Sequence, residues 1–85
     1  MQDFNYVIQD KDGIHARPAG VLVKIANGFK SQIAISKAAK KGDLKRIFSV
    51  MALGAKQGDT VTVRIEGEDE VQAAAALQEA LKNNL

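Results

Sequence analysis

The fold of this chain is decided by the stretch Val61-Thr62-Val63-Arg64-Ile65-Glu66. Apolar and polar side chains alternate along it with a period of two, and its apolar members are branched at Cβ, which suits the pleated backbone of a strand. A turn, Gln57-Gly58-Asp59, leads into it. We therefore expect a strand with one buried face and one face open to solvent.

A helix is predicted directly after this strand. Beyond Gly67, the residues Asp69 and Gln72 have the spacing of a capping box, in which side chains at a helix start bond to free backbone N–H groups. The alanine-rich segment that follows carries an apolar stripe at helical spacing, made of Ala74, Leu77, Leu81 and Leu85. The pattern predicts a C-terminal helix that buries one side.

The N-terminal part of the chain shows the same two periods. Residues 4–8 alternate as a strand does, and a polar turn ends this strand at Gly13. From Ala19 the apolar spacing becomes helical, which predicts a helix that begins close to His15 and stops at Asn27-Gly28. The apolar face of this helix is formed by Ala19, Leu22, Val23 and Ala26.

The middle of the chain is predicted to hold a hairpin and a short helix. Ile33 and Ile35 share one side of a short strand, and the polar residues 36–42 are expected to hold a turn and a brief further strand. Asp43 is expected to cap a short helix that stops at Gly54. The apolar positions of that helix are Leu44, Ile47, Phe48 and Met51.

The predicted element order is β-α-β-β-α-β-α. Strands that alternate on one face and helices that are apolar on one side pack most simply as two layers. We expect an α+β open-faced β-sandwich, in which three helices cover one face of a four-stranded antiparallel sheet. A chain of 85 residues suits one compact domain, residues 1–85, with a small core.

The composition excludes several classes of protein. The chain is 46% hydrophobic and 26% charged, as ordinary globular proteins are. It has no cysteine, which excludes disulfides, thiol nucleophiles and the common structural zinc sites. We expect no metal and no cofactor. No targeting segment and no apolar run of membrane-spanning length is found, and we expect a cytoplasmic protein without membrane insertion.

The charges are unevenly distributed along the chain. The net charge is only +2, yet five basic residues fall within ten positions: Lys37, Lys40, Lys41, Lys45 and Arg46. This cluster and a pI near 9.0 raise the alternative of a nucleic-acid-binding domain. Because aromatic residues are few and the net charge is small, we expect no nucleic-acid partner.

His15 is the only histidine and lies where the first helix is predicted to begin. Taken alone, it is more simply interpreted as an exposed residue without a task or as a helix cap. A helix start, however, offers free backbone N–H groups and a positive dipole end, which together bind anions. Ala16 and Arg17 would supply such N–H groups, Arg17 adds a guanidinium, and Pro18 suits the first turn. These residues form a candidate phosphate site.

The stretch Gly13-Ile14-His15-Ala16-Arg17-Pro18-Ala19 resembles the active-site signature of the HPr family, the histidine-containing phosphocarriers of the bacterial sugar phosphotransferase system. The likeness continues through residues 50–54 and 67–70 and covers the whole chain. It implies that His15 accepts a phosphoryl group on Nδ1 from enzyme I and donates it to sugar-specific IIA components, with Arg17 beside the group. A lone histidine suits a stoichiometric carrier better than an enzyme. A small carrier that presents one face to successive partners is most simply monomeric.

A histidine-phosphorylated regulatory paralogue that does not serve sugar uptake remains the alternative within the family.

The resemblance also implies an apolar surface that docks partners. It would consist of Gly20, Leu22 or Val23, Ile47, Phe48 and Met51, with Lys24 and Lys45 around it. The competing interpretation is that the apolar residues are core, which is as plausible for Leu22, Val23 and Met51. Ile47 and Phe48 cannot both point deep into so small a protein, so at least one is expected at the surface.

Arg46 departs from the family pattern. It occupies the position at which many Gram-positive members carry a serine that a dedicated kinase phosphorylates. We therefore do not expect regulation by HPr kinase. Ser49 lies almost a helical turn later and is not an obvious substitute.

Overall fold

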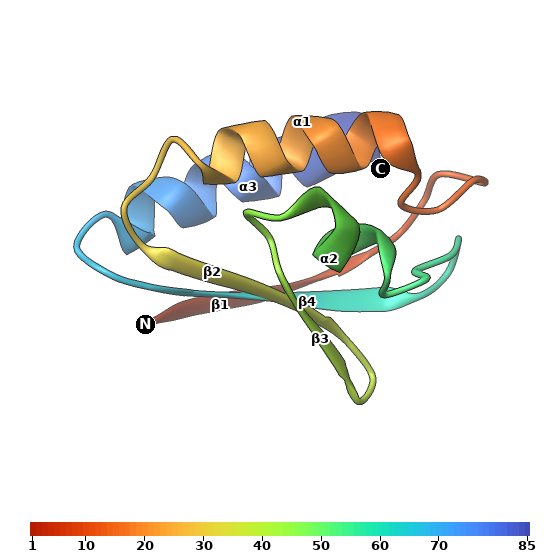
Figure 1. Ribbon diagram of the computed structural model, residues 1–85, viewed down its shortest axis with the longest axis horizontal. Helices are drawn as coiled ribbons and strands as arrows, with labels where there is room; N and C mark the ends of the chain where they lie inside the picture. Colours follow the sequence, from red (N-terminus) through yellow and green to blue (C-terminus); the bar gives the residue numbers. More distant parts are fainter.

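The computed structural model describes all 85 residues and contains the seven predicted elements in the predicted order (Figure 1). They are β1 (Gln2–Val7), α1 (Ala16–Ala26), β2 (Gln32–Lys37), β3 (Lys40–Asp43), α2 (Ile47–Met51), β4 (Thr60–Glu66) and α3 (Glu70–Asn84). No helix combines the length and the apolar character that crossing a membrane requires.

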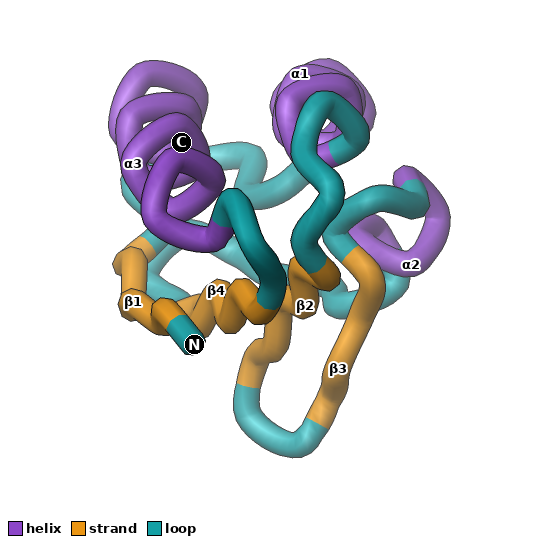
Figure 2. Tube along the Cα trace, turned by 90° about the vertical axis from the view of Figure 1, so that its left-hand side faces the viewer, coloured by secondary structure: helices purple, strands orange, loops and turns teal.

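The four strands form one antiparallel sheet in the order β1-β4-β2-β3. All three helices lie on the same side of this sheet and leave its other face uncovered (Figure 2). The predicted α+β open-faced β-sandwich is confirmed. Since β4 pairs with both β1 and β2, the strand with the clearest sequence pattern occupies the middle of the sheet.

The core fills the space between the sheet and the helices. Val61, Val63 and Ile65 of β4 are wholly buried and face the predicted stripe of α3, in which Leu77 and Leu81 are also wholly buried. The other large, fully buried apolar side chains come from all parts of the chain: Ile8, Leu22, Ile35, Leu44, Val50 and Leu53. The patterns of β4 and α3 therefore predicted the inward faces correctly. In α2 the spacing did not predict burial, because Val50 is the buried residue and Phe48 is 84% exposed.

The predicted start of the second helix is wrong. Asp43 is the last residue of β3, where it pairs with Ala34, and α2 begins only at Ile47 with Arg46 as its N-cap. The Asp43 carboxylate accepts the Lys45 N–H at 2.9 Å and thus closes a local turn. Aspartate supports such turns as readily as helix caps, and here the ladder with β2 fixes its backbone in the strand.

The predicted capping box is also wrong. Asp69 precedes α3, but its carboxylate makes no bond to that helix. It accepts the backbone N–H groups of Lys30 at 2.8 Å and of Ser31 at 3.0 Å, together with the Ser31 hydroxyl. We call this set the Asp69 clip. It holds the segment before β2 against the start of α3, so a residue expected to act locally joins positions 38 residues apart.

The Asp69 clip gives a prediction for stability. The hydrogen bond from the Ser31 hydroxyl, followed by that from the Lys30 N–H, lowers the pKa of Asp69 below its ordinary value of 3.8. The carboxylate's stabilising contribution is therefore complete above that ordinary value and is lost as the pH falls through the lower folded-state pKa. Asp69→Asn should lower the melting temperature by several degrees at about pH 7, and the difference should shrink below about pH 3. Thermal unfolding across this pH range measures both effects; a difference that grows toward acid would contradict the argument.

Candidate functional site

His15 lies at the N-cap of α1, at one end of the molecule, and its side chain is 42% exposed. The loop before it is shaped by Gly13, whose φ of +67° is left-handed. A Cβ at Gly13 would overlap the carbonyl oxygen of Ala55 and approach Cα of Lys56 to 2.9 Å. The Ile14 N–H donates to that Ala55 oxygen at 3.1 Å, so the chain is held tightly just before His15.

Two other segments anchor the same loop. The backbone N–H groups of Gln9 and Asp10 donate to the carbonyl oxygen of Leu85, at 2.6 and 2.8 Å. Lys37 bonds to the Gly54 carbonyl oxygen at 3.2 Å and pairs with Asp59 at 3.0 Å, which fixes residues 54–59. Figure 1 shows these loops and the C-terminus at the same end of the fold. The position of His15 is therefore set by contacts from several distant parts of the chain.

The start of α1 is open to an incoming anion. The N–H groups of Ala16 and Arg17 donate no hydrogen bond in the structure, whereas the His15 carbonyl oxygen accepts the Ala19 N–H at 3.0 Å. Pro18 is buried, and Arg17 is exposed with no ion-pair partner. The first turn of α1 contains no acidic residue. Free amides and the positive end of the helix dipole thus lie next to His15, and Arg17, two residues further along, carries a guanidinium without an ion-pair partner.

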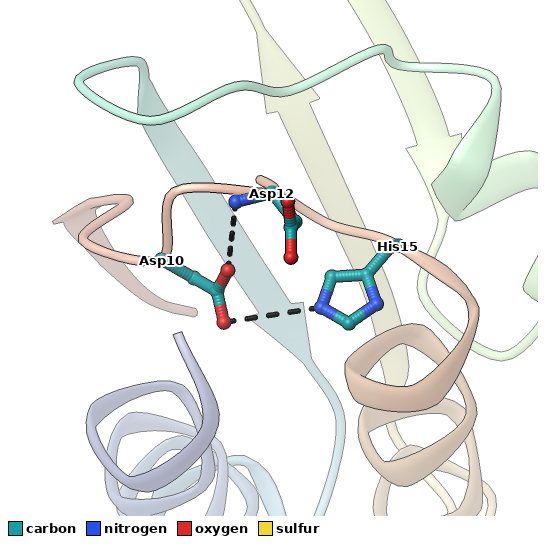
Figure 3. Close-up of side chains that lie close together, drawn as sticks. All are labelled: Asp10, Asp12 and His15. Carbon is teal, nitrogen blue, oxygen red and sulfur yellow. Dashed lines mark hydrogen bonds and ion pairs between the residues drawn. The ribbon is translucent and has the colours of Figure 1, made fainter.

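Two carboxylates from the polar turn between β1 and α1 lie on the other side of the imidazole ring. Figure 3 shows Asp10 and Asp12 with His15, and each of the three offers one potential ligand atom within 4.8 Å of the others. Oδ2 of Asp10 is 3.8 Å from Nε2 of His15. The second ring nitrogen, Nδ1, faces away from Asp10 (Figure 3). The sequence indicated that Asp10 and Asp12 lie near His15, because both come just before it. It did not indicate that their carboxylates point toward the ring.

The residues expected to form a docking surface lie on α1 and α2. Phe48 is 84% exposed, Met51 is partly exposed and Ile47 is half-buried, as expected from the argument that Ile47 and Phe48 cannot both point inward. Gly20 faces Ile47, since a Cβ there would meet its Cδ1 at 3.9 Å. We call the group Gly20, Val23, Ile47, Phe48 and Met51 the apolar patch.

Three further residues fit that surface less directly. Leu22 is completely buried, which leaves the half-buried Val23 as the member from that turn of α1. Lys24 is exposed in the last turn of α1. Lys45 is half-buried, and its ammonium group donates to the Phe29 carbonyl oxygen at 2.7 Å, so its charge is already engaged within the fold.

Arg46 and Ser49 occupy different environments. The Arg46 side chain is 81% exposed, and its Nε lies 3.8 Å from the Asp43 carboxylate. Ser49 is half-buried, and its hydroxyl oxygen accepts the Asp43 N–H at 2.8 Å. The serine nearest to Arg46 on α2 is thus tied to the β3 end by its own side chain.

Comparison with known proteins places the site in a family. Residues 2–83 match the model of the PTS HPr component phosphorylation site. The phosphocarrier protein HPr of Mycoplasma capricolum is 43% identical over 81 residues, which are 95% of this chain and 91% of that protein. HPr of Mycoplasma genitalium is 39% identical over 85 residues, 99% of this chain and 97% of the relative.

A crystal structure of HPr-C-His from Thermoanaerobacter tengcongensis superposes with a TM-score of 0.93 at 39% identity, and the match covers 99% of this chain and 94% of that one. Sequence and fold agree over almost the full length of both proteins. The chain therefore belongs to the HPr family, the phosphocarrier proteins of the phosphotransferase system.

Proposed function

We propose that this chain is a cytoplasmic, monomeric phosphocarrier domain that accepts a phosphoryl group on Nδ1 of His15 from enzyme I and passes it to sugar-specific IIA components. The observation that carries the proposal is the exposed imidazole at the start of α1, beside two backbone N–H groups that have no partner. Family membership supports the general phosphocarrier role.

The transfer uses the lone pair of a neutral imidazole. Nδ1 forms a bond to phosphorus while the bond between phosphorus and the donor breaks, and the electron pair of that bond leaves with the donor. The ring proton stays on Nε2. Negative charge on the phosphoryl oxygens is then stabilised by the N–H groups of Ala16 and Arg17, by the Arg17 guanidinium and by the α1 dipole. The reverse displacement delivers the group to the next protein.

The apolar patch is proposed to dock the donor and the acceptor in turn. Phe48 exposes most of its ring next to the partly exposed Met51, and an apolar residue so exposed at a surface marks an interaction site when others adjoin it. A small patch gives a contact that dissociates quickly, which a relay between two partners requires. Lys24 is free to attract acidic partner surfaces.

The regulatory paralogue would use the same histidine chemistry with different partners. Since Arg46 stands at the usual serine position and has no hydroxyl group, the proposed function does not include phosphorylation by HPr kinase. Transfer from phosphorylated protein to a IIA component supports the sugar-transport role, whereas phosphorylation without such transfer would favour the regulatory one.

Replacing His15 tests the proposal directly. Wild-type protein incubated with purified enzyme I and labelled phosphoenolpyruvate should take up one acid-labile label per chain, and His15→Ala should take up none. The variant should keep its circular dichroism spectrum, because the ring is 42% exposed and makes no hydrogen bond within the fold. Acid-labile label on the variant would refute the assignment.

Arg17→Ala should slow phosphoryl transfer by about 10- to 100-fold, the usual effect of removing one donor to a developing anion. The melting temperature should not change, because Arg17 is exposed and unpaired. Arg64→Ala is the matched control, since Arg64 is an exposed arginine on β4 whose guanidinium reaches only Asp3, at 4.0 Å. Equal transfer rates for the two variants in rapid-quench experiments would show that the guanidinium has no role.

Phe48→Ala should raise KM for transfer from enzyme I by about tenfold with little change in kcat, since truncation of an exposed aromatic anchor weakens docking but not chemistry. Its stability should be that of the wild type, because the side chain is 84% exposed. The exposed Val71 on α3 provides the control variant, Val71→Ala. A KM unchanged by Phe48→Ala argues against the apolar patch.

A further inference from the structure

The Asp10 carboxylate is fixed in place before any ligand arrives. One of its oxygens, Oδ1, accepts the Asp12 N–H at 2.8 Å. Its backbone N–H donates to Leu85 at 2.8 Å, and its backbone carbonyl accepts the Gly13 N–H at 3.0 Å. With backbone and Oδ1 both held, the remaining oxygen, Oδ2, is directed at Nε2 of His15, as Figure 3 shows.

This arrangement bears on which ring nitrogen carries the proton. A neutral imidazole has one N–H and one nitrogen with a free lone pair, and only the latter can attack phosphorus. An ionised carboxylate is solely an acceptor, so it favours the proton on the nitrogen that faces it. The 3.8 Å separation is longer than a hydrogen bond, but such contacts commonly tighten when the reacting partner binds.

We propose that Asp10 is a positioning residue that sets the tautomer of His15. Its carboxylate keeps the proton on Nε2 and leaves the lone pair on Nδ1, the nitrogen that faces away from the carboxylate. During transfer the N–P bond forms at Nδ1, the bond to the donor breaks, and the Nε2 proton remains beside Asp10. This inference rests on the proposed function, because it presumes that Nδ1 of His15 is the nucleophile.

Asp12 provides the contrast that makes the proposal testable. Its carboxylate belongs to the same cluster but forms no ion pair with the ring, whereas Asp10 does. A purely electrostatic influence would therefore come from both aspartates. An influence on the tautomer through the facing oxygen would come from Asp10 alone.

The decisive variant is Asp10→Asn. The amide oxygen of Asn can still accept the Asp12 N–H and preserve the turn, and its NH₂ group then faces Nε2 and can only donate to it. The variant therefore favours the proton on Nδ1 and removes the nucleophilic lone pair. Asp12→Asn, the matched control, loses the same charge and keeps the carboxylate of Asp10. Asp10→Ala places neither an acceptor nor a donor opposite Nε2.

The tautomer can be read from long-range ¹H–¹⁵N spectra of the ring, recorded at a pH about two units above the ordinary imidazole pKa of about 6.5. Because His15 is the only histidine, its ring signals do not overlap with others. The ratio of Nε2–H to Nδ1–H should be highest in the wild type and Asp12→Asn, lower in Asp10→Ala, and lowest in Asp10→Asn. The last variant should lie about two- to threefold below the wild type, the effect of the weakest ordinary hydrogen bonds, because the contact in the free protein is 3.8 Å long. Phosphoryl acceptance should slow in the same order.

The spectra need no phosphoryl donor, so the two proposals fail separately. A wild type that takes up no label on His15 refutes the proposed function, while the ring spectra still decide the role of Asp10. Equal tautomer ratios in Asp10→Asn and Asp12→Asn, in variants with wild-type backbone spectra, overturn the role of Asp10 even if transfer proceeds. If Asp10→Asn does not fold, the comparison of Asp10→Ala with Asp12→Asn decides in the same way.

Discussion

The structure is arranged around the inner face of β4, where Val61, Val63 and Ile65 are fully excluded from water. Since β4 pairs with β1 on one side and β2 on the other, burying this face requires all three helices on the same side of the sheet. The start of α1 then lies near the end of β1 and the beginning of β4. Reciprocal bonds, from Ile8 N–H to Asp59 and from Gly58 N–H to Ile8, join these ends. The position of His15 thus follows from hydrophobic burial.

The site itself combines opposite electrostatic influences on a single imidazole. The free amides of Ala16 and Arg17 lie at the start of α1 next to the ring, and the carboxylates of Asp10 and Asp12 are clustered with it. For a carrier this balance has a chemical meaning, because a site that only stabilised a phosphoryl dianion would retain it. The negative charges of Asp10 and Asp12 repel the phosphoryl oxygens and so oppose retention of the group. The N–H groups of Ala16 and Arg17 offset this repulsion in the transition state. The arrangement suits a group that is received and soon released.

Local patterns predicted the fold because burial acts residue by residue along each element. The period of two in β4 and the apolar stripe of α3 indicate which side chains are buried, without knowledge of the elements that pack against them. The start of α1 at His15 could be predicted for the same reason. Aspartates were less predictable, since one residue type serves caps, turns and distant contacts, and only the tertiary structure selects among them. Asp69 bonds to Ser31 rather than to its own helix for that reason.

The direction of Asp10 lies beyond sequence reasoning altogether, because it depends on the Leu85 carbonyl at the far end of the chain. Lys45 is a similar case. The sequence shows its charge but not that its ammonium group donates a hydrogen bond to the Phe29 carbonyl oxygen. What the fold leaves unused is equally informative. Ala16 and Arg17 keep unpartnered amides because the His15 side chain at the N-cap accepts no hydrogen bond from them, and Phe48 keeps its ring in water. A helix start without a side-chain cap has donors available for an anion, and an exposed ring has apolar area available for a partner; in the proposed function these are the phosphoryl group and the proteins that exchange it.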